Sequence, residues 1–225
     1  MAVQIQGNSG VVGEIDGITF RALRVTGRPI DYGALGFYRA SATSGTMAVS
    51  LGANAEIFQF RWPDATRFAA VTRVGISAGS NVAAAAAALL AFKCTIARSW
   101  TVAGSGGTRL TLTGNNQKLR TSMGTSLVND AGISTTAALT AGTKTLDAQD
   151  VGAVSFGVGT GAITVSPSLV ICPRYELLNV DASTDHPIIL AQNEGFVIRT
   201  GVNAFPAGMT WSFSVDVSWA EVAAF

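Results

Sequence analysis

The sequence contains very few of the residues on which metal sites and acid–base catalysis depend. Among its 225 residues there is one histidine and there are two cysteines, and these residue types are the usual protein ligands of transition metals. Histidine is also the side chain that most often transfers protons in enzymes. The composition therefore argues against an enzyme, and we expect no catalytic residues, no metal and no cofactor.

Charged side chains are scarce as well, and their signs nearly balance. They make up 13% of the chain, against about 25% in an average soluble domain. Fifteen basic and fourteen acidic residues leave a formal charge of +1, which is too little for a protein that neutralises the phosphates of a nucleic acid. We therefore expect no nucleic-acid partner.

No segment has the pattern of a secretory signal or of a membrane span. The first eight residues have neither a basic opening nor a continuous apolar stretch, which predicts synthesis in the cytoplasm. The longest apolar run, 82–92, has 11 residues, whereas a helix needs about 20 to cross a bilayer. Without an export signal, Cys94 and Cys172 are predicted to be buried free thiols.

The sequence does contain a strong alternation of apolar and polar residues, which is typical of half-buried β-strands. The clearest case is 211–219, where five large apolar residues alternate with serine and aspartate. A second strand is predicted at 56–62, with Phe58, Phe60 and Trp62 on one face. Shorter strands are predicted at 18–21, 110–113, 163–165 and 196–199.

Turn residues separate these predicted strands. The segments 114–116 and 206–208 contain the Gly, Asn and Pro residues that suit tight turns. The alanine-rich segment 81–90 is compatible with a short helix and equally with a strand or loop. Short strands between turn clusters indicate an all-β, single-domain β-sandwich with at most a short helix. We expect one domain over 1–225, with an extended arm over about 1–30.

The two halves of the chain differ in charge. Residues 1–120 contain 12 basic and 5 acidic side chains, and residues 121–225 contain 3 basic and 9 acidic ones. If the halves face different surroundings, complementary patches could steer assembly. If strands from the two halves interleave, the asymmetry disappears. Both interpretations stay open at the level of sequence.

Several short patterns suggest chemistry, but each has a simpler structural interpretation. His186 is the only imidazole, and its place directly before Pro187 favours a structural role over catalysis. Asp181, Ser183 and Asp185 have the spacing that opens a calcium loop, but the glycine and glutamate that complete such a loop are missing. The glycines of 157–162 precede a predicted strand where a dinucleotide site needs a helix, so we predict a hairpin there.

Tryptophan side chains can stack on sugar rings and carboxylates can hydrolyse glycosidic bonds, so we considered sugar binding and glycosidase activity. Trp211 and Trp219 share a strand face with Phe213, which favours core packing over sugar stacking. Trp100, which precedes a glycine-rich loop tip at 104–107, is the least constrained tryptophan. A glycosidase needs two paired carboxylates, and nothing in the sequence pairs any.

Three blocks of sequence resemble a family of structural proteins from tailed bacteriophages. They are IFQFRWPDATR at 57–67, LTLTGNNQKLRTSMG at 110–124 and HPIILAQNEGFVIR at 186–199, together with the closing Trp219-Ala220-Glu221-Val222. The resemblance spans most of the chain. It implies a virion component made in the host cytoplasm, located on the capsid exterior as a decoration or cement protein, with a jelly-roll-like sandwich and often a homotrimeric assembly.

This resemblance and the composition lead to one functional expectation. The family contributes no catalytic residues, and the implied partners are the major capsid protein and further copies of the chain, with no membrane. A cement protein that binds only the expanded shell stabilises it by mass action. We expect the N-terminal arm or the basic first half to contact an acidic capsid surface. The alternatives are a tail or fibre module that holds host glycans through Trp100 and a hydrolase of cell-wall sugars.

Overall fold

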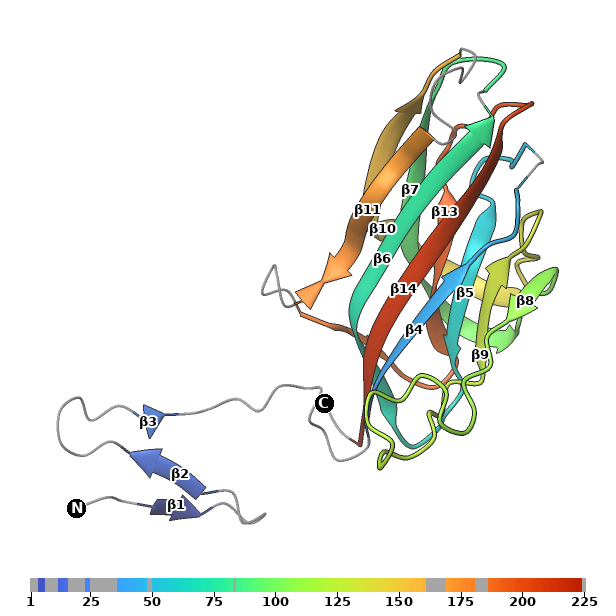
Figure 1. Cartoon of the computed structure of the whole chain (residues 1–225). Helices are drawn as coiled ribbons and strands as arrows, with labels where there is room; N and C mark the ends of the chain where they lie inside the picture. The colour runs from blue at the N-terminus through green and yellow to red at the C-terminus, as the bar shows by residue number, and fades with distance from the viewer. Residues whose placement is uncertain are drawn as a thin grey trace.

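The computed structural model describes residues 36–47, 50–82, 84–160, 169–180 and 186–223, and three short strands that precede them (Figure 1). These three are β1 (Gln4–Gln6), β2 (Val12–Ile15) and β3 (Leu23–Arg24). They pair antiparallel with one another in the order β1-β2-β3. They lie within the segment for which the sequence predicts an arm.

The remaining strands form two antiparallel sheets that pack face to face (Figure 1). The six-stranded sheet has the order β10-β7-β13-β5-β9-β8, with β5 (Glu56–Trp62), β7 (Ala88–Val102), β8 (Gly107–Arg109), β9 (Asp130–Ser134), β10 (Thr143–Val158) and β13 (Glu194–Thr200). The five-stranded sheet has the order β11-β6-β14-β4, with β12 also paired to β6. Its members are β4 (Phe37–Thr43), β6 (Phe68–Val82), β11 (Leu169–Asn179), β12 (Ile188–Leu190) and β14 (Thr210–Val222).

The pairing of the eight principal strands is nested. The first pairs with the last, β4 with β14, and then β5 pairs with β13, β6 with β11 and β7 with β10. A long hairpin rolled up on itself produces this order, which is that of a jelly roll. The prediction of an all-β, jelly-roll-like sandwich is therefore confirmed.

The core lies between the sheets and is rich in aromatic rings. The five apolar residues that alternate along 211–219 are each at most 1% exposed, which confirms the strand predicted there. Near one end of the core, Trp219 stacks on Tyr38 with ring centroids 5.6 Å apart and meets Phe60 edge-on at 5.2 Å. Near the other end, Phe205 stacks on Trp211 at 4.4 Å. The strands predicted at 56–62 and 196–199 are also present.

Three local predictions need correction or completion. The segment 110–113 is a loop, because β8 ends at Arg109 and the two leucines of the segment are not part of a ladder. Leu112 is nevertheless buried, which accounts for its apolar character without a strand. The alanine-rich segment forms no helix: β6 runs to Val82, β7 starts at Ala88, and the described residues between them form a bend. The strands predicted at 18–21 and 163–165 lie outside the described residues.

The hairpin predicted at 157–162 extends beyond the described residues, which stop at 160 in this segment. The next strand, β11, belongs to the opposite sheet, so this connection passes from one sheet to the other. The nested winding places these consecutive strands in different layers. The turns predicted at 114–116 and 206–208 are confirmed, and Gly114 and Gly208 have the positive φ values, 65° and 79°, that these turns require.

Cys94 and Cys172 are free and buried, as the sequence predicts. They belong to strands of opposite sheets, β7 and β11. Burial, with a smaller contribution from the nearby Asp150, raises the pKa of Cys94 to about 12. Burial also raises the pKa of Cys172. Both groups therefore remain thiols at neutral pH.

The nested pairing also decides between the two interpretations of the charge asymmetry. It places strands of the basic first half beside strands of the acidic second half, and seven ion pairs join a base from 1–120 to an acid from 121–225. Over the described residues the halves therefore interleave. Most described cations of the first half are paired within the fold. A contact between this half and an acidic capsid surface stays a prediction.

The chain covers several of its own sheet edges. On the β4 edge, the Arg39 N–H donates to the Gln117 carbonyl at 3.2 Å, and Tyr38 forms a bridge with Lys118. At the opposite side, β10 approaches β11 so closely that a Cβ on Gly152 would lie 2.0 Å from the Leu177 oxygen. Bare edges promote aggregation, and here the loop and the close approach cover them without a partner chain.

Candidate interface at a charge-free pole

Four connections of the jelly roll gather at one end of the sandwich, the upper end in Figure 1. They are the links β4–β5, β6–β7, β10–β11 and β13–β14. The strands joined by each link run in opposite directions, so alternate connections return to the same end. We call the described part of these four links, with the adjoining strand ends, the pole.

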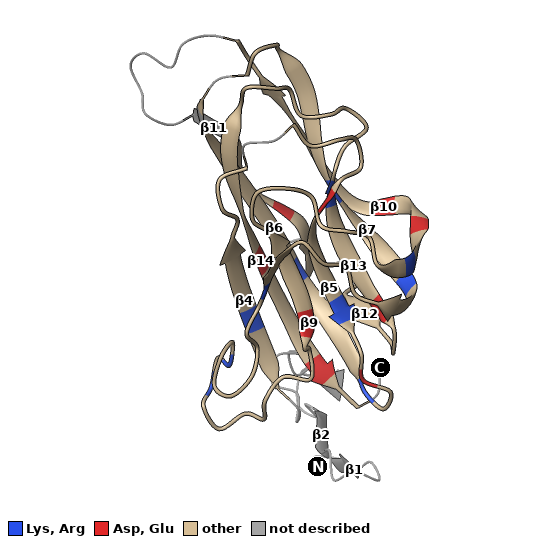
Figure 2. Cartoon of the chain, turned by 90° about the vertical axis from the view of Figure 1, so that its right-hand side faces the viewer, with Lys and Arg blue, Asp and Glu red and all other residues tan. Residues whose placement is uncertain are grey.

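The pole has no charged side chain among its described residues. The four sequence runs that form it are 16, 19, 23 and 16 residues long and contain no Lys, Arg, Asp or Glu, namely 40–55, 74–92, 151–173 and 200–215. Figure 2 shows the consequence, because the described ribbon at the upper end is neither blue nor red. Each run is unremarkable alone, and the fold brings all four together.

A belt of ion pairs lies directly below the pole. Seven of the eight residues that flank the charge-free runs belong to it, in the pairs Lys93–Asp150 (3.0 Å), Arg199–Asp150 (3.0 Å), Arg39–Asp216 (3.7 Å), Arg174–Asp216 (2.8 Å) and Arg73–Glu176 (2.5 Å). The eighth, Glu56, pairs with Lys144. Burial alone would raise the pKa of Asp150, but hydrogen bonds from Thr95, Arg199 and Lys93 outweigh it and lower the pKa. Each charged group of the belt thus has a partner of opposite sign, and its five bases and three acids leave a net charge of +2.

Because Glu176 is paired in the belt, we expect this residue to make the stability of the folded chain sensitive to acid. Hydrogen bonds from Arg73, and then from Arg174, lower the pKa of this carboxyl from 4.5 to about 2. A lowered pKa in the folded state adds stability above pH 4.5, and this stability is lost as the pH falls toward 2. The side chain is 24% exposed, so we expect about 1–2 kcal/mol.

Thermal unfolding of the wild type and of Glu176→Gln as a function of pH checks this contribution. Above pH 4.5 the wild type is expected to melt at a higher temperature than the variant, and this difference in melting temperature is expected to disappear as the pH falls from 4.5 to about 2. Glu194→Gln, which breaks an ion pair with Arg98 away from the belt, serves as the control. Equal wild-type and Glu176→Gln melting temperatures throughout this range would contradict the prediction.

Hydrogen bonds hold the loops of the pole in place. The Asn54 N–H donates to the Gly201 carbonyl at 2.8 Å, which joins the β4–β5 link to the β13–β14 link. The Ala85 N–H donates to the Ala207 carbonyl at 3.1 Å, which joins the β6–β7 bend to the same link. Phe205 anchors that link in the core against Trp211. A surface ordered in advance loses little conformational entropy when it binds a partner.

The pole also exposes large apolar side chains. Leu89 is 73% exposed, Val202 is 69% exposed and Val82 is 45% exposed. The side-chain amide of Asn203 donates to the Leu89 carbonyl at 2.8 Å, so the β13–β14 link lies beside the start of β7. Leu89 and Val202 therefore belong to one local surface.

The pole shares these properties with the centres of protein interfaces. Charged residues are depleted at the centres of protein interfaces, where an unpaired charge pays a large desolvation penalty. Contacts of uncharged groups are also insensitive to screening by salt. The pole lacks the cations with which a protein contacts phosphate groups.

Trp100 does not face solvent, contrary to the expectation for a glycan-binding aromatic. It is completely buried, and its indole N–H donates to the Val102 carbonyl at 3.0 Å. Ser99 has a left-handed φ of 51°, which interrupts the alternation and places the ring with Ala97 on the outer face of the six-stranded sheet. The glycan hypothesis in the form that relies on Trp100 is therefore wrong.

Of the other candidates for catalysis or calcium binding considered from sequence, His186 lies within the described residues. His186 is exposed, with Nδ1 2.7 Å from the Pro187 carbonyl oxygen. Asp181, Ser183 and Asp185 lie outside the described residues. The part of the chain that the structure describes contains no group of three or more His, Cys, Asp or Glu side chains able to hold a metal. It also contains no helix long and apolar enough to cross a membrane.

Individual contacts involve the sequence blocks 57–67, 110–124 and 219–222. Trp62, from the first block, donates its indole N–H to the Arg67 carbonyl at 2.8 Å. The Tyr38 hydroxyl donates to the carbonyl of Gly124, the last residue of the second block, at 2.9 Å. The closing segment contributes Trp219, which packs on Phe60. Phe60, Trp62 and Trp219 of these blocks lie in the core, whereas most residues of the second block, 110–124, are exposed.

Comparisons with protein-family models, with curated proteins and with solved structures find no match to this chain. A functional proposal therefore starts from the jelly roll, the pole and the resemblance of the sequence blocks.

Proposed function

We propose that this chain is a non-enzymatic structural protein of a tailed-phage virion that decorates the outside of the head and stabilises it. The observation that carries the proposal is the pole, where the described parts of four charge-free runs lie at one end of a jelly roll. The resemblance of the sequence blocks supports the choice of a phage particle. In this proposal the pole docks on the major capsid protein.

The pole and the start of the described body lie at opposite ends of the sandwich, which suits docking through the pole. Gly36, the first residue of the described body, accepts a hydrogen bond from the Glu221 N–H at 3.0 Å, at the end away from the pole (Figure 1). Docking through the pole therefore leaves this end and the charged belt outside the contact. The belt then keeps the outer surface of the decorated particle hydrated.

Decoration stabilises a shell by mass action. A protein that binds only the expanded shell stabilises it by about 2.7 kcal/mol per site when its free concentration is 100 times Kd. Assembly as a homotrimer, which the resemblance implies, would let several weak pole contacts act together through avidity. Light scattering of the purified chain tests the trimer independently of head binding.

Localisation on the particle tests this proposal first. Gold-labelled antibody raised against the purified chain is expected to cover the heads of intact virions. Purified chain added to heads stripped of it is expected to bind equally well at low and high salt and to raise the temperature at which the heads release DNA. Labels confined to the tail would overturn the proposal and favour a tail or fibre module. Binding to heads that is lost at high salt would contradict docking through the charge-free pole.

A further inference from the structure

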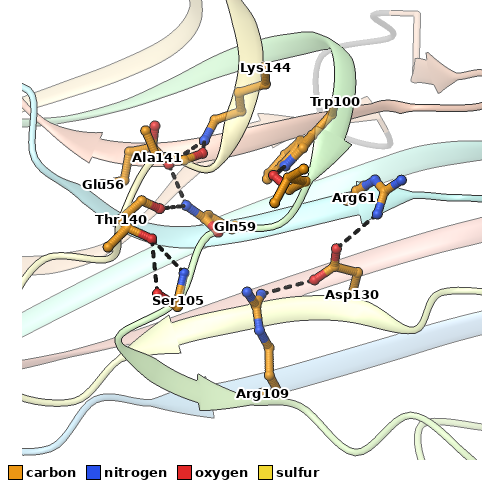
Figure 3. A network of polar contacts seen from close by, with 11 residues as sticks. Glu56, Gln59, Arg61, Trp100, Ser105, Arg109, Asp130, Thr140, Ala141 and Lys144 are labelled. Atoms are coloured by element: carbon orange, nitrogen blue, oxygen red, sulfur yellow. Dashed lines mark hydrogen bonds and ion pairs between the residues drawn. The ribbon is translucent and has the colours of Figure 1, made fainter.

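A second site, independent of the pole, lies on the outer face of the six-stranded sheet (Figure 3). It combines Lys144 from the start of β10 with Glu56 and Gln59 from β5. The side chains of Lys144 and Glu56 are only 2% and 8% exposed, and their Nζ and Oε2 atoms are 2.8 Å apart. A lysine is rarely buried to this extent unless it is paired.

The carboxamide of Gln59 is held against the same carboxylate. Its Nε2 donates to Glu56 Oε2 at 2.6 Å and to the Thr140 carbonyl at 2.8 Å. Its Oε1 has no hydrogen-bond partner among the described residues, although Gln59 is fully buried. Gly104 closes the site, because a Cβ there would lie 2.6 Å from both amide atoms.

Apolar groups shield this site from water. The Trp100 ring lies over Lys144, with Nζ 4.5 Å from the ring centroid. Trp100 packs with Ala97 and Val197, and Leu146 of β10 packs against them. The three polar side chains are therefore enclosed between the sheet and the start of β10.

If these three side chains had only a structural role, their burial would cost folding free energy without a clear return. A buried ion pair commonly contributes no net stability over apolar residues of similar size, and a buried carbonyl without a partner is destabilising. The same three groups are, however, the components of an acyl transfer. They are an amine nucleophile, a carboxamide acceptor and a carboxylate that contacts the nitrogen of each.

We infer that Lys144 and Gln59 form an intramolecular isopeptide bond. Glu56 first removes a proton from the Lys144 ammonium. The neutral Nζ then attacks Gln59 Cδ, and the electron pair of the carbonyl moves to Oε1. Glu56 transfers its proton to Nε2 and accepts one from Nζ. The Cδ–Nε2 bond breaks, and ammonia leaves. One C–N bond forms and one breaks, so the reaction needs no oxidant or further reactant.

Proximity makes this otherwise slow exchange feasible. Groups held in a reactive geometry behave as though present at effective concentrations of about 10⁵–10⁸ M. Glu56 Oε2 is 2.8 Å from the attacking nitrogen and 2.6 Å from the departing nitrogen. One carboxylate therefore reaches both nitrogens between which protons must move.

The bond would fasten parts of the sheet that are not adjacent. In the six-stranded sheet, β7 and β13 lie between β10 and β5. The β10–β7 register shifts between Leu146 and Asp150, and Lys144 belongs to the segment before this shift. The bond would join this segment covalently to β5. It would thereby hold the C-terminal end of the long β7–β10 connection, 103–142, against the sheet.

Intact mass of the purified full chain under denaturing conditions tests the inference. We expect the wild type to be lighter than its sequence by one ammonia, about 17 Da. Lys144→Arg keeps the positive charge without an amine nucleophile, and Glu56→Gln removes the proton carrier, so both are expected at full mass. The control Lys93→Arg alters a lysine paired with Asp150 at 3.0 Å, and it is expected to keep the deficit.

Peptide mapping identifies the acceptor. Tryptic digestion should yield one branched peptide that joins 40–61 to 121–174, because trypsin cannot cleave at an acylated Lys144. A full-mass, folded wild type would overturn the inference. A loss of about 18 Da, the mass of water, with Lys144 joined to Glu56 would overturn Gln59 as the acceptor. None of these outcomes depends on whether the chain binds phage heads.

Discussion

Leu89→Asp is expected to weaken binding to phage heads by about 100-fold or more, because the interface would bury an unpaired charge. The fold is expected to tolerate the change, since Leu89 is 73% exposed and such surface substitutions usually alter stability by about 0.5 kcal/mol or less. Val202→Asp, at a position 69% exposed, is expected to act in the same way. Co-sedimentation with stripped heads measures the binding, and thermal unfolding measures the stability.

Leu119→Asp provides a matched control. Leu119 is 59% exposed and belongs to the loop whose neighbouring residues cover the β4 edge, away from the pole. We expect this variant to bind heads normally. Deletion of residues 2–12 tests the alternative in which the N-terminal arm makes the contact. Binding that survives Leu89→Asp but is lost on this deletion would contradict the role of the pole and favour the arm.

Trp219→Ala is expected to lower the free energy of unfolding by about 3–5 kcal/mol. The total stability of a domain is commonly about 5–15 kcal/mol, so this single change removes a large share of it. Trp219 is completely buried and contacts aromatic rings from both sheets, Tyr38 of β4 and Phe60 of β5. Its removal leaves a cavity between the two sheets, and the surrounding strands can close this cavity only in part.

Guanidinium unfolding, followed by tryptophan fluorescence and circular dichroism, measures this loss. Trp219→Phe keeps an aromatic ring between the sheets and is expected to lose clearly less stability than Trp219→Ala. Trp100→Phe is a useful comparison, because Trp100 packs in the separate outer cluster. A Trp219→Ala variant as stable as the wild type would contradict the assignment of Trp219 to the centre of the packing.

The alternation of apolar and polar residues predicted strands where one face of the strand is buried and the other is not. The alternation in 211–219 and 56–62 predicted two strands correctly, because successive side chains on a strand point to opposite faces. The same rule failed at 110–113, where Leu112 is buried from a loop. It also could not place Trp100, because the left-handed Ser99 changes the face to which the chain presents its side chains.

The sequence by itself determined the all-β class, the free thiols and the four runs without charge. Only the tertiary structure decided that the described parts of these runs meet in one pole and that bases of the first half pair with acids of the second. It also decided that Lys144 and Gln59 both donate to the same oxygen, Oε2 of Glu56. The physical reason is the nested pairing, which joins residues as distant in sequence as Ser41 and Asp216. Local composition and periodicity do not encode which distant strands will pair, so the surfaces formed by that pairing appear only in the folded chain.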